Sequence, residues 1–158
     1  MLKKNAYFWQ MQKLNLPDVC LKIKSKENKL FIFDPFRKKD IMLTPEEWVR
    51  QHFANYLVHH KNYPSSLTAL EKELILNNTK KRTDILIYNS KGTPEIIVEC
   101  KASSVKITQE VFDQIARYNL ELNAKYLVVT NGLEHYFCQM DFENKKYVFL
   151  KDIPNYTI

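Results

Sequence analysis

Glu95-Ile-Ile-Val-Glu-Cys-Lys101 is a short apolar run that ends in two charged side chains. Residues two apart on a strand share a face, so Glu99 and Lys101 project together with Ile97 beneath them. A carboxylate and an ammonium directly after three apolar residues are costly in a core unless they are paired. The stretch therefore predicts a buried strand whose end carries either a salt bridge or a site that uses both charges.

The run Asp84-Ile-Leu-Ile-Tyr88 precedes it and predicts the neighbouring strand. An antiparallel hairpin that pairs Tyr88 with Glu95 places Asp84 opposite Glu99, with Cβ atoms about 4.5–5.5 Å apart. Two carboxylates at that distance repel each other unless a proton or a cation lies between them. The pair therefore predicts a site for Mg²⁺, with Mn²⁺ as a substitute. Lys101 then stands beside the ion, where it can orient a water molecule or meet a phosphate oxygen.

Helix and strand signals along the whole chain predict an α/β or α+β fold, with a mixed β-sheet flanked by helices. Thr44-Pro-Glu-Glu47 combines a cap, a proline at the first helical position and a glutamate three after the cap, and predicts a helix to about residue 60. Thr108 is expected to cap a second helix that ends near residue 122. The expected strands cover residues 19–24, 30–33, 73–76, 84–88, 95–101, 126–130, 135–140 and 147–150.

The positive charge of the chain is confined to its first quarter. Residues 1–40 hold ten basic and four acidic residues, whereas residues 41–158 hold 14 of each, which accounts for the net charge of +6. We expect a basic N-terminal arm with a β-hairpin over residues 1–40 and the main domain over 41–158, as one compact unit. Lys22, Lys24 and Lys26 are candidates for phosphate contacts. The alternative is a lysine-rich, solvated hairpin edge.

Polar residues on the two predicted helices are further candidates. At 100° per residue, Glu46 shares the inward face of the first helix with Val49, whereas Glu47 points away. Glu46 is therefore either a third metal ligand or a carboxylate stabilised by the helix dipole. The residues Gln114, Arg117 and Tyr118 share one face of the second helix, and their spacing alone indicates a polar edge that meets solvent.

Composition and missing motifs exclude several classes of protein. With only two glycines, the chain has no dinucleotide-binding loop, and it contains no phosphate-binding P-loop, so no nucleotide cofactor is expected. No apolar run is long enough for a membrane span, and the N-terminus lacks the apolar region of a signal peptide. Three widely spaced cysteines give no disulfide framework. We expect a reduced, cytoplasmic protein that does not associate with membranes.

Taken together, these motifs resemble the type I restriction enzyme R-subunit N-terminal domain family, within the PD-(D/E)xK nuclease superfamily. The matching stretches are 43–50, 81–84, 98–102, 112–119 and 130–132, and the resemblance covers the chain from about Phe31 to the C-terminus. It implies a restriction-endonuclease-like core.

The resemblance also implies roles for single residues. Asp84 and Glu99 correspond to metal ligands, Lys101 to the catalytic lysine, and Glu46 to the acidic residue of the family's first helix. Gln114 joins the catalytic set and, with Tyr118, forms a QxxxY motif that supports the site and contacts DNA; Arg117 lies between them.

We therefore expect a Mg²⁺-dependent deoxyribonuclease, an endonuclease or exonuclease that hydrolyses phosphodiester bonds. Two alternatives stay open: a non-catalytic nucleic-acid-binding module with a nuclease fold, and a subunit that depends on a partner to supply DNA. DNA is the expected partner, and a homodimer or a separate protein partner is left open. The motifs do not predict the DNA sequence specificity, because none of them is a base-reading motif.

Overall fold

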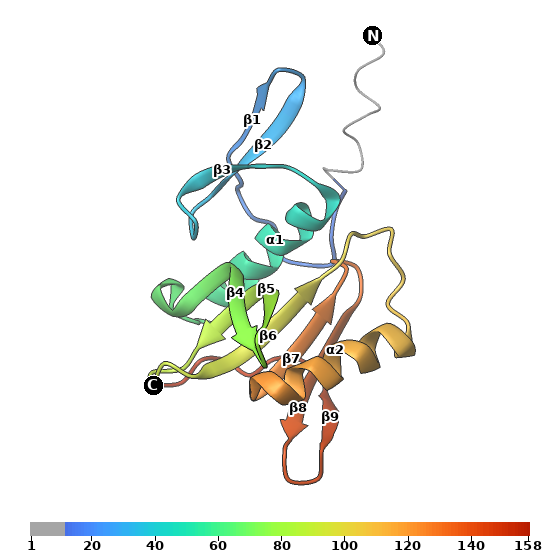
Figure 1. Ribbon diagram of the computed structural model, residues 1–158. Helices are drawn as coiled ribbons and strands as arrows, with labels where there is room; N and C mark the ends of the chain where they lie inside the picture. The colour runs from blue at the N-terminus through green and yellow to red at the C-terminus, as the bar shows by residue number, and fades with distance from the viewer. Residues whose placement is uncertain (1–11) are drawn as a thin grey trace.

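The computed structural model describes residues 12–158, which form two β-sheets and two α-helices (Figure 1). The smaller sheet has the order β1-β2-β3 and contains β1 (Ile23–Lys26), β2 (Lys29–Asp34) and β3 (Lys39–Met42). The larger sheet runs in sequence order and contains β4 (Thr68–Leu76), β5 (Thr79–Tyr88), β6 (Pro94–Cys100), β7 (Tyr126–Thr130), β8 (His135–Asp141) and β9 (Lys146–Leu150). The helices are α1 (Pro45–His59) and α2 (Gln109–Leu122), and a 3-10 turn, η2 (Ser65–Leu67), precedes β4.

The larger sheet is mixed, because β6 and β7 are parallel whereas its other neighbours are antiparallel. Parallel neighbours need a long crossover, and here α2 supplies it. This topology brings the C-terminal ends of β6 and β7 together, so that Cys100 pairs with Thr130. The predicted α+β class with helices flanking a mixed sheet is confirmed.

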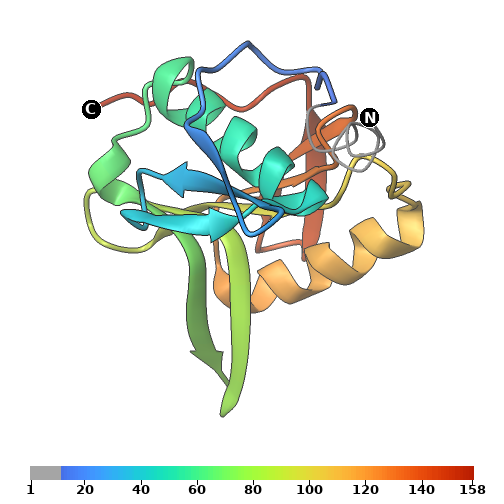
Figure 2. The same cartoon turned by 90° about the horizontal axis from the view of Figure 1, so that it is seen from above.

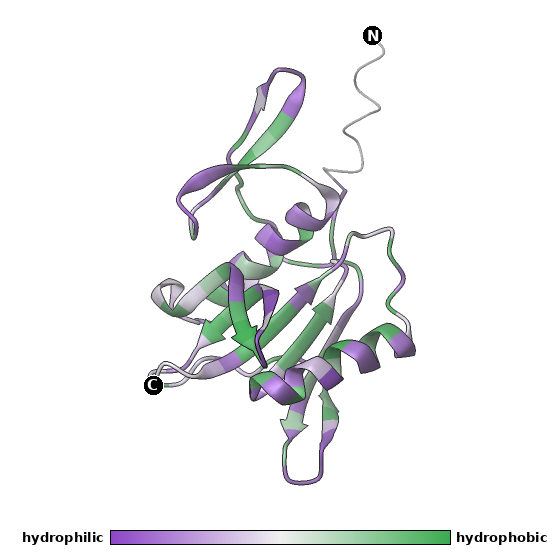
Figure 3. Ribbon diagram, viewed as in Figure 1, coloured by the Kyte–Doolittle hydropathy of each residue, from purple (hydrophilic) through white to green (hydrophobic). Residues whose placement is uncertain are grey.

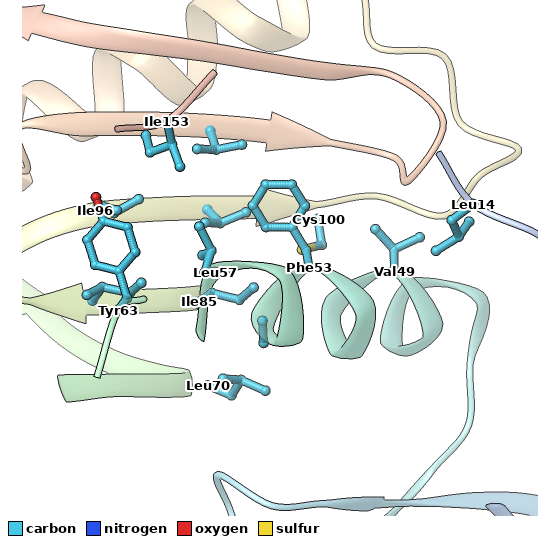
Figure 4. Close-up of a cluster of buried hydrophobic side chains, with 14 of the residues drawn as sticks. Leu14, Val49, Phe53, Leu57, Tyr63, Leu70, Ile85, Ile96, Cys100 and Ile153 are labelled. Atoms are coloured by element: carbon cyan, nitrogen blue, oxygen red, sulfur yellow. The ribbon is translucent and has the colours of Figure 1, made fainter. Parts of the chain in front are cut away.

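Helix α1 covers one face of the larger sheet. The backbone N–H of Glu47 donates to Thr44 Oγ1 at 3.0 Å, so the predicted cap is formed. Val49, Phe53 and Leu57 are fully buried along the helix, and Figure 4 shows them directed at the strands and at Ile153.

Helix α2 covers the opposite face, where Phe112 and Ala116 pack with Leu86 and Ile97. Thr108 caps this helix through the N–H of Val111, as predicted. Both faces of the central strands are therefore buried, which is consistent with their continuous apolar sequence (Figure 3).

The N-terminal hairpin forms, but its first strand begins later than predicted and its second strand is longer, and a third strand follows it. β1 begins at Ile23, and the missed β3 pairs with β2, with Phe31 opposite Met42. Asp34 turns the chain between β2 and β3, because its carboxylate accepts hydrogen bonds from the N–H groups of Phe36 and Arg37. Residues 1–11 of the predicted basic arm lie outside the described residues, and the division at residue 40 stays a prediction.

The hairpin β4–β5 is much longer than predicted. It turns at Asn77 and Asn78, which have φ values of 48° and 62° and form the two-residue connection typical of tight hairpins. The predicted pairing of Tyr88 with Glu95 is wrong, because a register irregularity between Ile87 and Tyr88 pairs Tyr88 with Pro94.

No helix within residues 12–158 has both the length and the apolar character needed to cross a membrane.

Candidate functional site

Asp84 of β5 and Glu99 of β6 lie side by side close to the end of β6. The pairing of Ile85 with Val98 sets the two carboxylates next to each other. Asp84 is held at both oxygens: Oδ2 accepts a hydrogen bond from the N–H of Cys100 at 2.7 Å, and Oδ1 accepts one from Arg50 Nη2 at 2.7 Å. The orientation of Asp84 is thus fixed by two elements, α1 and β6.

Glu99 has an environment that disfavours its charge. Burial, the negative charge of Asp84 and a hydrogen bond shared with Asp84 raise the pKa of Glu99 to about 8, and the nearby charge of Lys101 only partly opposes this. Burial and the charge of Asp84 therefore disfavour a second negative charge at this pair. A cation placed between the two carboxylates would relieve the same repulsion.

Lys101 is the first residue after β6, and its backbone is anchored to β7. Its N–H donates to the carbonyl of Thr130 at 2.8 Å. Its charge lowers the pKa of both Glu46 and Glu99, against the larger effect of their burial. In the part of the chain that the structure describes, Lys101 forms no ion pair with Glu99, so a simple strand-end salt bridge does not account for the two residues.

Glu46 reaches the same site from the first turn of α1. Its Oε1 lies 3.0 Å from Arg50 Nη2, and burial together with the charge of Asp84 raises its pKa. The prediction that Glu47 points away from the protein is wrong, because Glu47 is buried and accepts from Arg37, Arg50 and Gln51. The physical reason is the smaller sheet, whose Arg37 pairs with Asp34 and reaches over that side of the helix.

Arg50 and Glu71 belong to the site, although no sequence pattern assigned them a role. Nη2 of Arg50 lies 2.8 Å from Glu71, and it also contacts Glu46 and Asp84. Burial opposes the charge of Arg50, but Asp84 and Glu47 outweigh this and raise its pKa. The spacing of Arg50 four residues after Glu46 was a signal for this contact, whereas nothing in the sequence around Glu71 indicated its place.

Of the three polar residues predicted on α2, only Tyr118 approaches the carboxylates. Burial and the negative charge of Glu99 raise the pKa of Tyr118 to about 12, and its hydroxyl is buried without a hydrogen-bond partner in residues 12–158. Gln114 and Arg117 are exposed. The charge of Arg117 acts on Asp113, whose pKa is lowered mainly by hydrogen bonds from Tyr147 and Gln109.

The predicted phosphate-contacting lysines lie on the smaller sheet and on the segment before it. Lys22, Lys24 and Lys26 are all exposed, and Lys24 pairs with Asp40. Among the contacts of the described residues, none joins these lysines to Asp84 or Glu99. Their role in DNA binding stays a prediction.

The side chains at the site have the donor chemistry that Mg²⁺ requires. Asp84, Glu99 and Glu46 all offer carboxylate oxygens, which are the ligands that hard divalent cations prefer. Within residues 12–158, no group of three or more Asp, Glu, His or Cys side chains is already arranged around a metal position. Glu46 and Asp84 instead both contact the guanidinium of Arg50, which lies 3.0 Å from Glu46 and 2.7 Å from Asp84.

Glu99 should make the protein less stable as the pH rises. Its pKa is raised from 4.5 to about 8 in the folded state, so the protonated carboxyl favours folding below about pH 4.5, and this contribution is lost as the pH approaches 8. We expect Glu99→Gln to remove the loss, which amounts to a few kcal/mol at about 1.4 kcal/mol per pKa unit. Urea unfolding at pH 5 and pH 8.5 measures it, with the exposed Glu143→Gln as the control. Equal pH slopes for wild type and Glu99→Gln would contradict the assignment.

One protein family matches most of the chain. The family described as the type I restriction enzyme R protein N terminus matches residues 45–154, from the first residue of α1 to a point beyond β9. The match includes Glu46, Asp84, Glu99 and Lys101, and it leaves out the smaller sheet. No curated protein matches the chain. Because the matched segment covers more than half of the sequence, the chain belongs to the type I restriction enzyme R protein N-terminus family.

Proposed function

We propose that this protein is a Mg²⁺-dependent deoxyribonuclease with a PD-(D/E)xK site. The observation that carries the proposal is the partly buried pair of carboxylates, Asp84 and Glu99, held next to each other with Lys101 at the same strand end. The family supports it, because restriction enzymes act on DNA.

Each side chain has a task in the proposed reaction. Asp84 and Glu99 would hold the ion, with Glu46 as the third ligand from α1. A divalent cation bound there would polarise the scissile phosphate and lower the pKa of a bound water. Lys101 would stabilise the negative charge that develops on the phosphate. The unpartnered hydroxyl of Tyr118 donates to a water or a phosphate oxygen beside Glu99.

A binding module without activity fits the site less well. Carboxylates that face a phosphate weaken its binding unless a cation lies between them, so a protein that only binds DNA gains nothing from Asp84 and Glu99. A subunit that depends on a partner keeps the same chemistry and differs only in how DNA arrives. The homodimer, the protein partner and the cytoplasmic location stay predictions.

Cleavage of defined DNA tests the proposal. Linear, nicked and single-stranded DNA are incubated with the full chain and Mg²⁺, Mn²⁺ or EDTA. We expect cleavage with either metal, none with EDTA, and none with Glu99→Gln. Lys91→Ala, which removes an exposed lysine at the β5–β6 turn, is the control and should cleave normally. Absence of metal-dependent cleavage on every DNA form, alone and with candidate partner subunits, would overturn the enzyme assignment.

The basic N-terminal arm should set DNA affinity rather than turnover. We expect the combined replacement of Lys22, Lys24 and Lys26 with Gln to reduce the slope of log affinity against log salt, by about 0.9 for each phosphate of duplex DNA that the arm no longer neutralises. Binding measured at several salt concentrations gives the slope. A slope equal to that of the wild type would identify these lysines as a solvated edge, and single-turnover cleavage at saturating protein should be unchanged.

A further inference from the structure

The outer half of the β4–β5 hairpin is a two-stranded ribbon that no other strand of the described chain joins. β4 and β5 stay paired out to Leu76 opposite Thr79, whereas β6 pairs with β5 only from Ile85 onward. Figure 2 shows the ribbon projecting from the body of the protein. Asp84 lies at its base, so the ribbon begins at the candidate metal site.

The ribbon is turned relative to the sheet from which it extends. Ile85 packs on the α1 side of the sheet, and in a flat strand Lys81, four residues earlier, would lie on the same side. Instead, the ammonium of Lys81 lies 4.8 Å from the ring centre of Tyr118 on α2. Opposite this part of β5, Glu71 has a φ of 54°, a strained conformation for a residue other than glycine. Its carboxylate forms ion pairs with Arg50 at 2.8 Å and with Arg82 at 2.9 Å, which link this part of β4 to α1 and β5.

One face of the ribbon packs against the protein and the other is exposed to solvent. Leu74 and Leu76 pack against the cluster under α2, so the ribbon is not an isolated hairpin, which would be only marginally stable. The opposite face carries Ile75, Lys80 and Arg82, and their exposed fractions are 70%, 72% and 63%. On the exposed face, Lys80 pairs with Glu73 at 3.1 Å and Arg82 pairs with Glu71 at 2.9 Å. The ribbon thus projects from the protein with one face packed and the other exposed to solvent.

The charge of the ribbon is complementary to a phosphate backbone. Residues 72–82 contain four basic residues and one acidic residue, whereas residues 41–158 as a whole have no net charge. At the tip, Asn77 and Asn78 are exposed beside Ile75. Asparagine can bind the edge of adenine through two hydrogen bonds, and an apolar side chain can contact the methyl group of thymine.

We propose that the β4–β5 ribbon enters the major groove of duplex DNA while the phosphodiester backbone lies at Asp84 and Glu99. A two-stranded ribbon fits the major groove, which is about 12 Å wide and 8.5 Å deep. From Asp84 to Thr79 the strand extends about 17 Å at roughly 3.4 Å per residue, so the tip reaches base edges from a site at the backbone. This inference rests on the proposed function and names the form of its substrate, which is the double helix.

DNA binding without divalent metal tests the ribbon separately from catalysis. Fluorescence anisotropy in EDTA compares a 30-base-pair duplex with one of its single strands, using the full chain. The variant Ile75→Thr/Asn77→Gly/Asn78→Gly keeps the charge, and glycine accepts the positive φ of the turn. We expect its duplex affinity to fall at least about tenfold, with an unchanged salt slope and unchanged single-strand affinity. Val148→Thr, at an exposed apolar position on β9, is the matched control.

A second variant reports the charge of the same ribbon. Lys80→Gln/Lys81→Gln should lower the salt slope on duplex DNA by about 1.8, if each lysine contacts one phosphate. The inference would be overturned if the triple variant bound the duplex as tightly as the wild type does. It would also be overturned if the wild-type protein bound the single strand more tightly than the duplex. Unchanged thermal unfolding midpoints show that the variants are folded.

The outcomes separate this inference from the proposed function. If the wild type cleaves DNA but the ribbon variants bind the duplex normally, the nuclease assignment stands and the role of the ribbon is overturned. If the ribbon variants lose duplex affinity but the wild type cleaves no DNA with any metal, the role of the ribbon stands and the nuclease assignment is overturned.

Discussion

Lys101→Ala should abolish DNA cleavage while leaving metal binding intact. If Lys101 stabilises charge that develops only in the transition state, its removal lowers turnover by at least about 100-fold, the usual effect of losing one such donor. Because one cation among 24 basic residues contributes little to ground-state binding, DNA affinity should change only slightly. Single-turnover cleavage, Mn²⁺ calorimetry and DNA anisotropy on the same preparation measure the three quantities.

Two further variants sharpen that result. Lys101→Arg should not restore activity, because a planar guanidinium cannot take the place of a compact ammonium beside the carboxylates. Lys91→Ala removes an equally charged, exposed side chain and should behave as the wild type. Normal turnover in Lys101→Ala would show that the lysine acts outside the transition state, and an effect on DNA affinity alone would favour the binding module.

Asp84→Asn should lose most of its affinity for Mn²⁺. Loss of an outer partner of a metal ligand costs roughly 10–100-fold in affinity, and loss of a charged ligand itself should cost at least as much. Calorimetry at pH 7.5 measures the dissociation constant. The exposed Asp18→Asn is the matched control, and equal Mn²⁺ affinity in Asp84→Asn and wild type would exclude Asp84 as a ligand.

Asparagine is a better test than alanine because of the contacts that Asp84 makes. An asparagine still accepts hydrogen bonds from the Cys100 N–H or from Arg50, whereas alanine leaves the buried guanidinium without one of its partners. Removing one member of a buried ion pair is strongly destabilising. We therefore expect Asp84→Ala to lower the unfolding midpoint. Glu99→Gln removes only a repelling charge, so at pH values above 8 it should have a higher unfolding midpoint than the wild type.

Local spacing was enough to predict most of the elements and the adjacency of the two central carboxylates of the site. Thr44 and Thr108 cap helices where their patterns indicated, because a cap acts within one turn of its own helix. Two-residue periodicity determines which side chains share a strand face, so Asp84, Glu99 and Lys101 could be placed together from two neighbouring runs. The exact pairing of Tyr88 could not be predicted, because the irregularity in the strand pairing has no distinct signal in the sequence here.

Residue patterns alone were therefore sufficient for the type and order of most elements and for the acidic pair at the end of two adjacent strands. The packing of distant elements was needed to bury Glu47, to let Arg50 join Glu46 to Glu71 and Asp84, and to make β4–β5 project as a ribbon. Arg50 and Asp84 are 34 residues apart. Contacts over such distances depend on how α1, the smaller sheet and the strained Glu71 pack together, and the periodicity of a single helix or strand carries no information about that packing.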